Sequence, residues 1–326
     1  MVTAQRIVSL ISSATEILYR LGLGDRVVGV SHECDYPSDV LRKPRLTRSL
    51  VDSNAASRAI DEQVRSLAGS QSALYSIDVE QLAALRPDLI ITQAQCDVCA
   101  VRYDDVVAAV RNTPQLTGTR LVALNPRSIS EVLDDITRVG EAIGGDDVAA
   151  RASMVRAGLT ARLAALEASG AAAAAVHRPR VILLEWVDPP MVASNWMPEL
   201  VAMAGGEAGL AAGGAHSSYA RWQDIVNYDP QVLVIVPCGF DVERAVVESQ
   251  VLTAWPGWNE LSAVREGRVF AADGNAYFNR SGPRLVDSAE LLGYLFHPNH
   301  FPLPTGEAAR AFRRLETRDA ALVPSA

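Results

Sequence analysis

Short, mostly aliphatic runs alternate with amphipathic stretches along almost the whole chain. The stretch 128–144, for example, carries apolar residues at helical spacing. Runs typical of buried strands occur at 7–10, 27–30, 89–91, 120–124, 180–186, 232–236 and 269–272. This alternation predicts an α/β fold with mostly parallel sheets, in which ligands bind off the carboxyl ends of the strands.

The middle of the chain is rich in alanine, and no turn signal interrupts it between residue 147 and Ser169-Gly170. One long helix is the simplest interpretation. Because it lies between two strand-and-helix halves, we expect it to join two lobes; an exposed helix packed on the first lobe alone is the alternative. The expected division is an N-terminal α/β lobe (1–145), a connector helix (146–177), a C-terminal α/β lobe (178–300) and a polar, loosely packed tail (301–326).

The two halves share a local pattern. In residues 82–96 a helix ends near Pro87, an aliphatic strand follows, and Cys96 comes just after it. In residues 225–238 a helix ends near Pro230, and a second aliphatic strand leads to Cys238. The pattern predicts two related lobes that present equivalent loops, although proline before a buried strand is common enough for a chance match.

Composition narrows the class of protein. The chain has 326 residues, of which 49% are hydrophobic and 21% charged, as in ordinary globular proteins. Its net charge of −8 argues against a nucleic-acid partner. No apolar run approaches the roughly 18 to 20 residues that span a bilayer, so no membrane span is expected. The N-terminus has no signal-like apolar region, which predicts a cytoplasmic location; a leader preceding Met1 would make the protein periplasmic or surface-anchored.

The four cysteines, Cys34, Cys96, Cys99 and Cys238, all follow predicted strands. An amphipathic stretch at 100–110 places Cys99 in the first turn of a helix, where the helix dipole would stabilise a thiolate. The C-x-x-C spacing lets two sulfurs reach one ion, and Cys34 and Cys238 could complete the ligands of a zinc ion or an iron-sulfur cluster. A redox pair at Cys96 and Cys99, or four inert thiols, are the alternatives. No catalytic triad, phosphate-binding glycine loop or pair of catalytic carboxylates can be recognised, so the chain is not expected to be an enzyme.

Several longer motifs add to this interpretation. They are RIVSL at 6–10 followed by SATE at 13–16, LRPDLI at 85–90, Gly205-Gly206 and YFNRSGPR at 277–284. With them the chain resembles the cobalamin-binding branch of the class III, helical-backbone substrate-binding proteins of ABC importers. The resemblance implies two α/β lobes joined by one helix, a ligand held in the cleft between them, and an ABC permease as partner.

The resemblance also suggests residues that line the cleft. It implies the loop after the 89–91 strand, with Gln93 and Gln95, the loops of Trp186 and Trp196, and Tyr277, Phe278 and Arg280. Trp222, and Tyr36 in the polar loop 31–37, complete the predicted ligand-binding set. For Trp186, Trp196 and Trp222, core packing is the alternative to ligand stacking, and for Arg280 and Arg284 it is salt bridging within the protein.

The sequence therefore predicts a binding protein for a small molecule, cobalamin or a related corrinoid or metal chelate, in a cytosolic variant of the importer family. A flat corrinoid needs broad apolar faces and a few polar groups for its amides, which aromatic loops supply. A metal or iron-sulfur protein with cysteine ligands and redox activity is the alternative.

Overall fold

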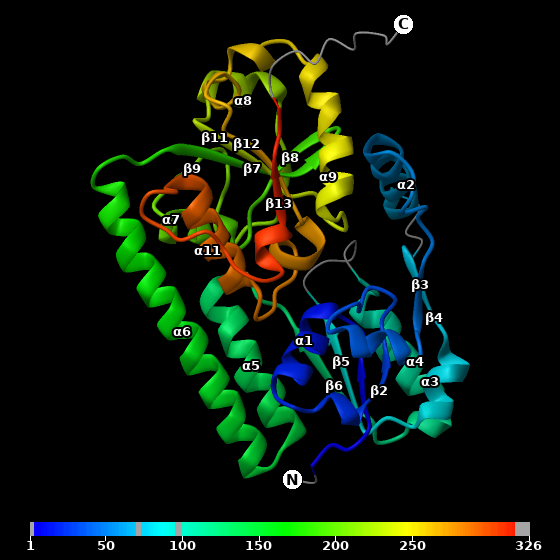
Figure 1. Cartoon of the computed structure of the whole chain (residues 1–326). Coiled ribbons are helices and arrows are strands. Elements are labelled where there is room, and N and C mark those ends of the chain that lie inside the picture. Colours follow the sequence, from blue (N-terminus) through cyan, green and yellow to red (C-terminus); the bar gives the residue numbers. More distant parts are fainter. Residues whose placement is uncertain (1–2, 70–72, 95–99, 317–326) are drawn as a thin grey trace, which may run out of the picture. The chain divides into compact units, whose positions relative to one another are not determined.

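The computed structural model describes residues 3–69, 73–94 and 100–316, and it divides into two compact units. Unit 1 comprises the chain up to Ala164 together with Arg280–Val286, and unit 2 comprises Ala165–Asn279 and the chain from Asp287 onward. Each unit contains a sheet flanked by helices (Figure 1). No helix in the described ranges combines the length and the apolar composition of a bilayer-crossing segment.

Unit 1 is built on a parallel sheet with the strand order β2-β1-β5-β6. Its two central strands are completely buried because helices cover both faces, as parallel sheets require. Figure 1 shows α1 and α5 to the left of these strands and α3 and α4 to their right. The elements are β1 (Ile7–Ser9), α1 (Ser12–Arg20), β2 (Val27–Val30), α3 (Val79–Leu85), β5 (Leu89–Gln93), α4 (Tyr103–Asn112), β6 (Arg120–Leu124) and α5 (Ile129–Ile143).

A small hairpin in unit 1 has no counterpart in the sequence prediction. Strands β3 (Thr47–Ser49) and β4 (Tyr75–Ile77) pair antiparallel and enclose α2 (Ser57–Gly69). Neither strand is among the runs that the sequence predicted. Strands of three residues with polar side chains leave no aliphatic run, and backbone pairing alone defines them.

Unit 2 repeats the parallel core. Strands β7 (Arg180–Val187), β11 (Val232–Ile235) and β12 (Val269–Ala272) are parallel neighbours, and β9 (Glu207–Ala208) pairs parallel with the start of β7. Antiparallel strands β8 (Pro190–Val192) and β10 (Ser218–Tyr219) extend one side. The α/β class with mostly parallel sheets is confirmed. The helices are α7 (Met197–Met203), α8 (Trp222–Tyr228), α9 (Val242–Ser249), α10 (Ser262–Arg265) and α11 (Leu285–Phe296), which begins within the unit 1 segment.

The stretch after Pro302 differs from the expected loosely packed tail. Residues Phe312–Arg314 form β13, which pairs antiparallel with β12 at the other edge of the unit 2 sheet. The ring of Phe312 lies 6.4 Å from that of Phe270 and 6.0 Å from that of Tyr294, centroid to centroid. The packing of Phe312 and the backbone pairing with β12 thus give a regular structure to a segment whose composition is mainly polar.

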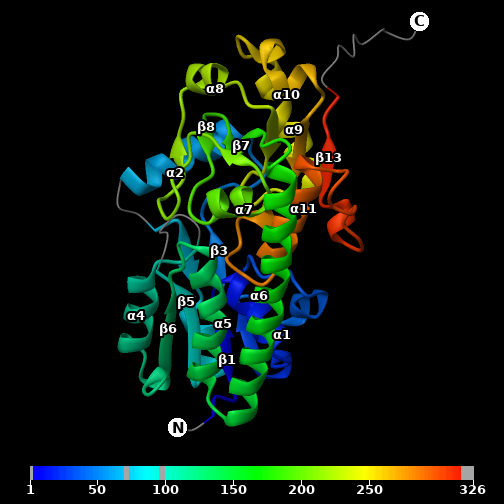
Figure 2. The same ribbon diagram turned by 90° about the vertical axis from the view of Figure 1, so that its left-hand side faces the viewer.

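The alanine-rich region forms the expected long helix, α6 (Asp146–Ala174), which is unbroken in Figure 2. Its buried residues recur every three to seven positions and are Val148, Ala152, Leu159, Leu163, Leu166, Gly170 and Ala173. The chain passes from unit 1 to unit 2 between Ala164 and Ala165, inside this helix. The domain boundaries at 145 and 177 stay a prediction.

The repeat predicted from the sequence is present in the backbone of both units. Helices α3 and α8 each end at a left-handed residue followed by proline: Arg86 with φ 44° and Asp229 with φ 50°. In unit 1, Arg6 at the start of the sheet donates from Nη2 to the Leu85 carbonyl at 2.6 Å. In unit 2, Arg180 donates in the same way to the Asp229 carbonyl at 2.6 Å. In each unit, therefore, an arginine at the start of a central strand donates to a backbone carbonyl that the end of the equivalent helix leaves without a helical partner.

Candidate functional site

The loop 31–37 follows β2 at the carboxyl-end edge of the unit 1 sheet, where α/β proteins bind ligands. Two arginines satisfy its backbone carbonyls. Arg45 donates to the carbonyls of Ser31, at 2.9 Å, and of Cys34. Arg280 donates to the carbonyl of Glu33 at 3.2 Å. Because guanidinium groups hold the backbone at three points, the loop has a fixed conformation before any ligand arrives.

Arg280 and Arg284 are engaged by carboxylates of unit 1. Glu16 on α1 is buried, and Arg284 binds it at two points, with Nε to Oε2 at 3.0 Å and Nη2 to Oε1 at 2.6 Å. Arg280 lies 3.5 Å from Glu16 and donates to Asp35 at 2.8 Å. Burial alone would lower the pKa of Arg280, but Asp35 and Glu16 outweigh it and raise the pKa. Of the two sequence interpretations for these arginines, the structure shows internal salt bridging.

Tyr36 is the aromatic residue that this ion-pair cluster positions. The Arg284 guanidinium carbon lies 4.1 Å from the centre of the Tyr36 ring, a cation–π contact, and the side chain is 36% exposed. One side of the ring therefore rests on a partly buried arginine that Glu16 binds at two points. An exposed aromatic ring with a restrained orientation is suited to stacking on a flat ligand.

Cys34 does not have the surroundings of a metal ligand. Its side chain is fully buried, and its sulfur accepts a hydrogen bond from Thr15 at 3.1 Å. Burial raises the pKa of the Cys34 thiol to about 11, so the thiolate that metals require is disfavoured at neutral pH. Among the described residues, no group of three histidine, cysteine or acidic side chains is placed to hold a metal ion. The structure therefore shows Cys34 as a buried thiol, and its role as a metal ligand together with Cys96 and Cys99 stays a prediction.

The remaining cysteines are tested only in part. Cys96 and Cys99, like Gln95, lie outside the described residues. Helix α4 begins at Tyr103, and the expectation that Cys99 occupies the first turn of a helix also lies outside the described residues. Cys238 is half-buried after β11, and its backbone N–H donates to the Glu185 carbonyl at 3.1 Å.

Gln93, the last residue of β5, is buried and directs its amide to the protein backbone. Its Nε2 donates to the carbonyl of Val101 at 3.4 Å. This bond ties the end of the strand to the segment just before α4. The structure thus gives Gln93 a supporting role at the end of β5.

Aromatic side chains gather at the carboxyl-end edge of the unit 2 sheet. Trp186 near the end of β7 is half-buried, and its ring centre lies 5.1 Å from that of Phe240, which follows β11. Arg244 on α9 places its guanidinium carbon 3.8 Å from the Phe240 ring centre. Trp186 is therefore a partly exposed ring that packs against another side chain of its own unit, as Tyr36 does in unit 1. The sequence indicated Trp186 but not Phe240 or Arg244.

Three other predicted aromatic residues are packed inside unit 2. Trp196 is 5% exposed, and its indole N–H donates to the Phe278 carbonyl at 3.0 Å. Phe278 is fully buried and Tyr277 is 5% exposed. Together they hold the π-helical turn Gly274–Phe278 against α7. These contacts give the three side chains a role in shaping this turn.

Trp222 belongs to the core of unit 2. Its ring lies 6.2 Å from Trp258 and 5.2 Å from Trp255, and its indole N–H donates to the Pro256 carbonyl at 2.7 Å. Every polar and apolar part of this side chain thus has a partner within the fold. The prediction of Trp222 as a ligand contact is corrected to core packing, the alternative that the sequence left open.

Glu185 is a residue of this edge that the sequence did not single out. It stands one position before Trp186 and accepts a 2.6 Å hydrogen bond from Ser217 on Oε2. Burial raises the pKa of Glu185, and the bond from Ser217 opposes that rise. A half-buried acid next to an exposed ring is a group that can contact a ligand directly.

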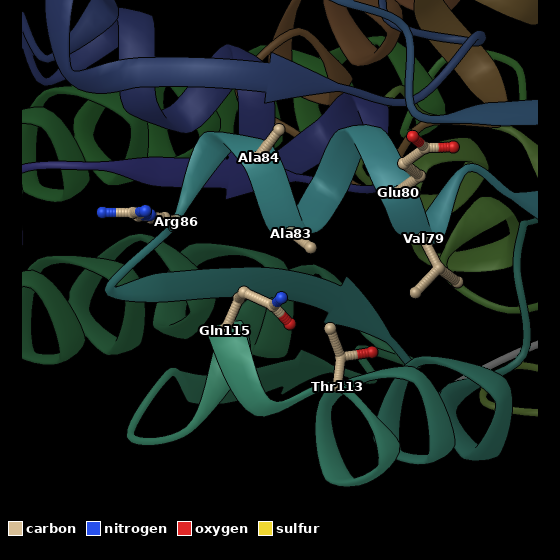
Figure 3. Close-up of a pocket in the computed structure, with 7 residues that line it drawn as sticks. All are labelled: Val79, Glu80, Ala83, Ala84, Arg86, Thr113 and Gln115. Atoms are coloured by element: carbon tan, nitrogen blue, oxygen red, sulfur yellow. The ribbon is translucent and has the colours of Figure 1, made fainter.

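An open groove of about 670 Å³ lies elsewhere in unit 1. Figure 3 shows Val79 and Ala83 of α3 facing Thr113 and Gln115, with Arg86 at one end. None of the residues that line it is among the predicted site residues or in the loop 31–37. Its short, mostly uncharged side chains offer few groups that could orient a ligand.

Residues 7–276 match the sequence model of the family described as periplasmic binding protein. The chain belongs to this family. The uncharacterised ABC transporter substrate-binding lipoprotein YvrC of Bacillus subtilis is 25% identical over 305 residues, which cover 91% of this chain and 81% of that protein. The vitamin B12-binding protein of Vibrio cholerae is 24% identical over 292 residues, or 89% of this chain and 88% of that protein.

Among solved structures, a periplasmic haem-binding protein of Pseudomonas aeruginosa matches this periplasmic binding protein with a TM-score of 0.69. The two share 22% identity, and the match covers 93% of this chain and 96% of the other. The structural match shows the fold, and the family match confirms the substrate-binding-protein family that the sequence motifs suggested. The relatives are binding proteins by name, which also confirms that the chain is not an enzyme.

Proposed function

We propose that this periplasmic binding protein is the substrate-binding component of an ABC importer and that it takes a flat metal chelate, with cobalamin as the first candidate. The observation that carries the proposal is the Tyr36 ring, half-exposed and seated on Arg284. The Trp186 and Phe240 rings supply a second aromatic surface at the equivalent edge of unit 2. Relatives that bind vitamin B12 support the choice of ligand. That the ligand lies in a cleft between two lobes stays a prediction.

The charges of the site support a corrinoid over a haem. A haem presents two carboxylates, which arginines usually bind. Arg280 and Arg284 are engaged by Glu16 and Asp35, and Glu185 adds an acid at the edge of unit 2. A cobalamin presents amides, which do not require an additional cation. The described residues therefore suit a ligand with a polar but uncharged rim.

We infer that the protein works outside the cytoplasm with a permease. The relatives include a lipoprotein, and the solved haem-binding protein is periplasmic by name, so the expected cytoplasmic location has no support from them. Free thiols are open to oxidation in such a compartment. Cys34, however, is buried and its pKa is raised, which protects the thiol from oxidation.

Titration of the purified protein with cyanocobalamin, followed by tryptophan fluorescence and calorimetry, tests the proposal. We expect one saturable site with a Kd of about 1 µM or lower. Tyr36→Ala should weaken binding about tenfold, whereas Tyr219→Ala, which removes another exposed ring, should not. Haemin serves as the competing ligand. Absence of saturable binding of cyanocobalamin up to about 100 µM would reject cobalamin as the ligand.

A further inference from the structure

Glu185 occupies an irregular position in its strand. The antiparallel register of β7 with β8 pairs Leu184 with Val192 and Trp186 with Met191, which leaves Glu185 as an extra residue. Such a β-bulge redirects a side chain and is frequent beside functional sites. The Glu185 carbonyl also accepts the Cys238 N–H, which joins the carboxyl ends of β7 and β11. Glu185 is therefore fixed at the same edge as the Trp186 ring.

Ser217 connects Glu185 to the backbone. Its Oγ accepts a bond from the backbone N–H of Ser194 at 3.0 Å and donates to Glu185 Oε2 at 2.6 Å. Within the described residues nothing donates to Oε1, and Glu185 forms no ion pair there. One oxygen of the carboxyl group is thus held by the protein, and the other is available.

Burial raises the pKa of Glu185, whereas the hydrogen bond from Ser217 stabilises its carboxylate form. When Glu185 is protonated, its Oε1 can donate a hydrogen bond. When Glu185 is ionised, Oε1 can only accept one. A ligand amide can meet either form because it both donates and accepts. A ligand carboxylate meets repulsion from the ionised form and can bind only the acid.

We propose that Glu185 is a specificity-determining residue, which favours ligands with an amide-bearing rim and disfavours ligands that carry carboxylates. This inference rests on the proposed function and deepens it. It assigns the choice between corrinoid and haem to one side chain of unit 2, held by Ser217 and aimed by the bulge in β7.

The test compares Kd values for cyanocobalamin and for haemin in the wild type, Glu185→Gln and Glu185→Ala. The isosteric amide should leave cyanocobalamin affinity within about threefold and strengthen haemin binding by about fivefold or more. The alanine variant should weaken cyanocobalamin binding about tenfold, because the ligand amide loses its partner. Glu167→Gln, on the exposed face of α6, is the control and should change neither Kd. Unchanged melting temperatures show that the variants fold.

The outcomes separate the two proposals. The ratio of the haemin Kd to the cyanocobalamin Kd decides the first case. If the wild type binds cyanocobalamin and this ratio changes by less than twofold in both Glu185 variants, the role of Glu185 is rejected and the proposed function stands. A wild type that prefers haemin also rejects the role of Glu185. If the wild type binds neither ligand, the proposed function fails, and the inference fails with it.

Discussion

Glu16 and Arg284, which are 268 positions apart in the sequence, form a two-point ion pair in the interior of unit 1. Their side chains are 3% and 12% exposed. Arg280 approaches the same carboxylate, so that a single acid on α1 holds both arginines of the segment Arg280–Val286. These ion pairs tie the short segment to α1 of unit 1, although the chain before and after it belongs to unit 2.

Removal of the acid should therefore strongly destabilise unit 1. Glu16→Gln leaves two buried guanidinium groups without their shared carboxylate, and the expected loss is about 3–5 kcal/mol in the free energy of unfolding. Urea denaturation of the variant measures it. Glu243→Gln is the matched control: it breaks an exposed pair with Arg313 and should cost about 0.5 kcal/mol or less. Equal losses in the two variants would contradict the structural role of Glu16.

Asp135 should make stability fall as the pH rises. This carboxyl group on α5 is 1% exposed; Arg138 donates to Oδ1 at 2.7 Å, while no described residue donates to Oδ2. Burial raises its pKa from 3.8 to about 7. Between these values the native state binds more protons than the unfolded state, so the stabilisation present below pH 3.8 is lost as the pH passes through about 7.

Asp135→Asn removes the titrating group and keeps its shape. We expect the variant to gain on the order of a few kcal/mol over the wild type between pH 4 and pH 8 in urea denaturation. At pH 4 the two proteins should differ little, because the native wild type is already protonated. A wild type whose stability does not fall over this range would show that Asp135 ionises normally.

The strands with aliphatic runs were predictable because their own side chains build the core. Strand β5, for example, is buried at every position, and its sequence carries that information. Strands β3 and β13 were not predictable, since Thr47–Ser49 and Phe312–Arg314 are mostly polar and exist only by pairing with a neighbour. The composition of a short segment does not reveal which distant strand it will pair with.

The same reasoning explains the candidate site. Tyr36 and Trp186 could be named from the sequence because they are aromatic residues in or beside predicted loops. Trp222 has the same composition signal, but it packs against Trp258, a contact that only the fold reveals. Glu185 resembles any polar residue near the end of a strand, because its bulge is a property of the register with β8.

Cys34 should be unreactive in the native protein. A pKa of about 11, against 9.0 for an ordinary thiol, lowers the thiolate fraction at neutral pH by about a hundredfold, and burial excludes the reagent as well. Peptide-resolved mass spectrometry after iodoacetamide treatment at pH 7.5 measures the rate at this residue. We expect alkylation of Cys34 at least about a hundredfold slower than in urea. Comparable rates in the two conditions would show that the thiol is accessible and would reopen the case for Cys34 as a ligand.

Two glycines of α6 should respond in opposite ways to the same substitution. A Cβ atom built on Gly170 would lie 2.0 Å from the Met203 carbonyl oxygen, at the end of α7, so Gly170→Ala must force these helices apart. At Gly158 nothing lies within 4 Å, and alanine there improves helix propensity. We expect a loss of about 3 kcal/mol or more for Gly170→Ala and a gain of about 0.5–1 kcal/mol for Gly158→Ala. Thermal and urea denaturation of both variants measure the difference. Equal and small effects would mean that α6 does not pack closely on α7, whereas opposite signs would establish Gly170 as the contact point in unit 2.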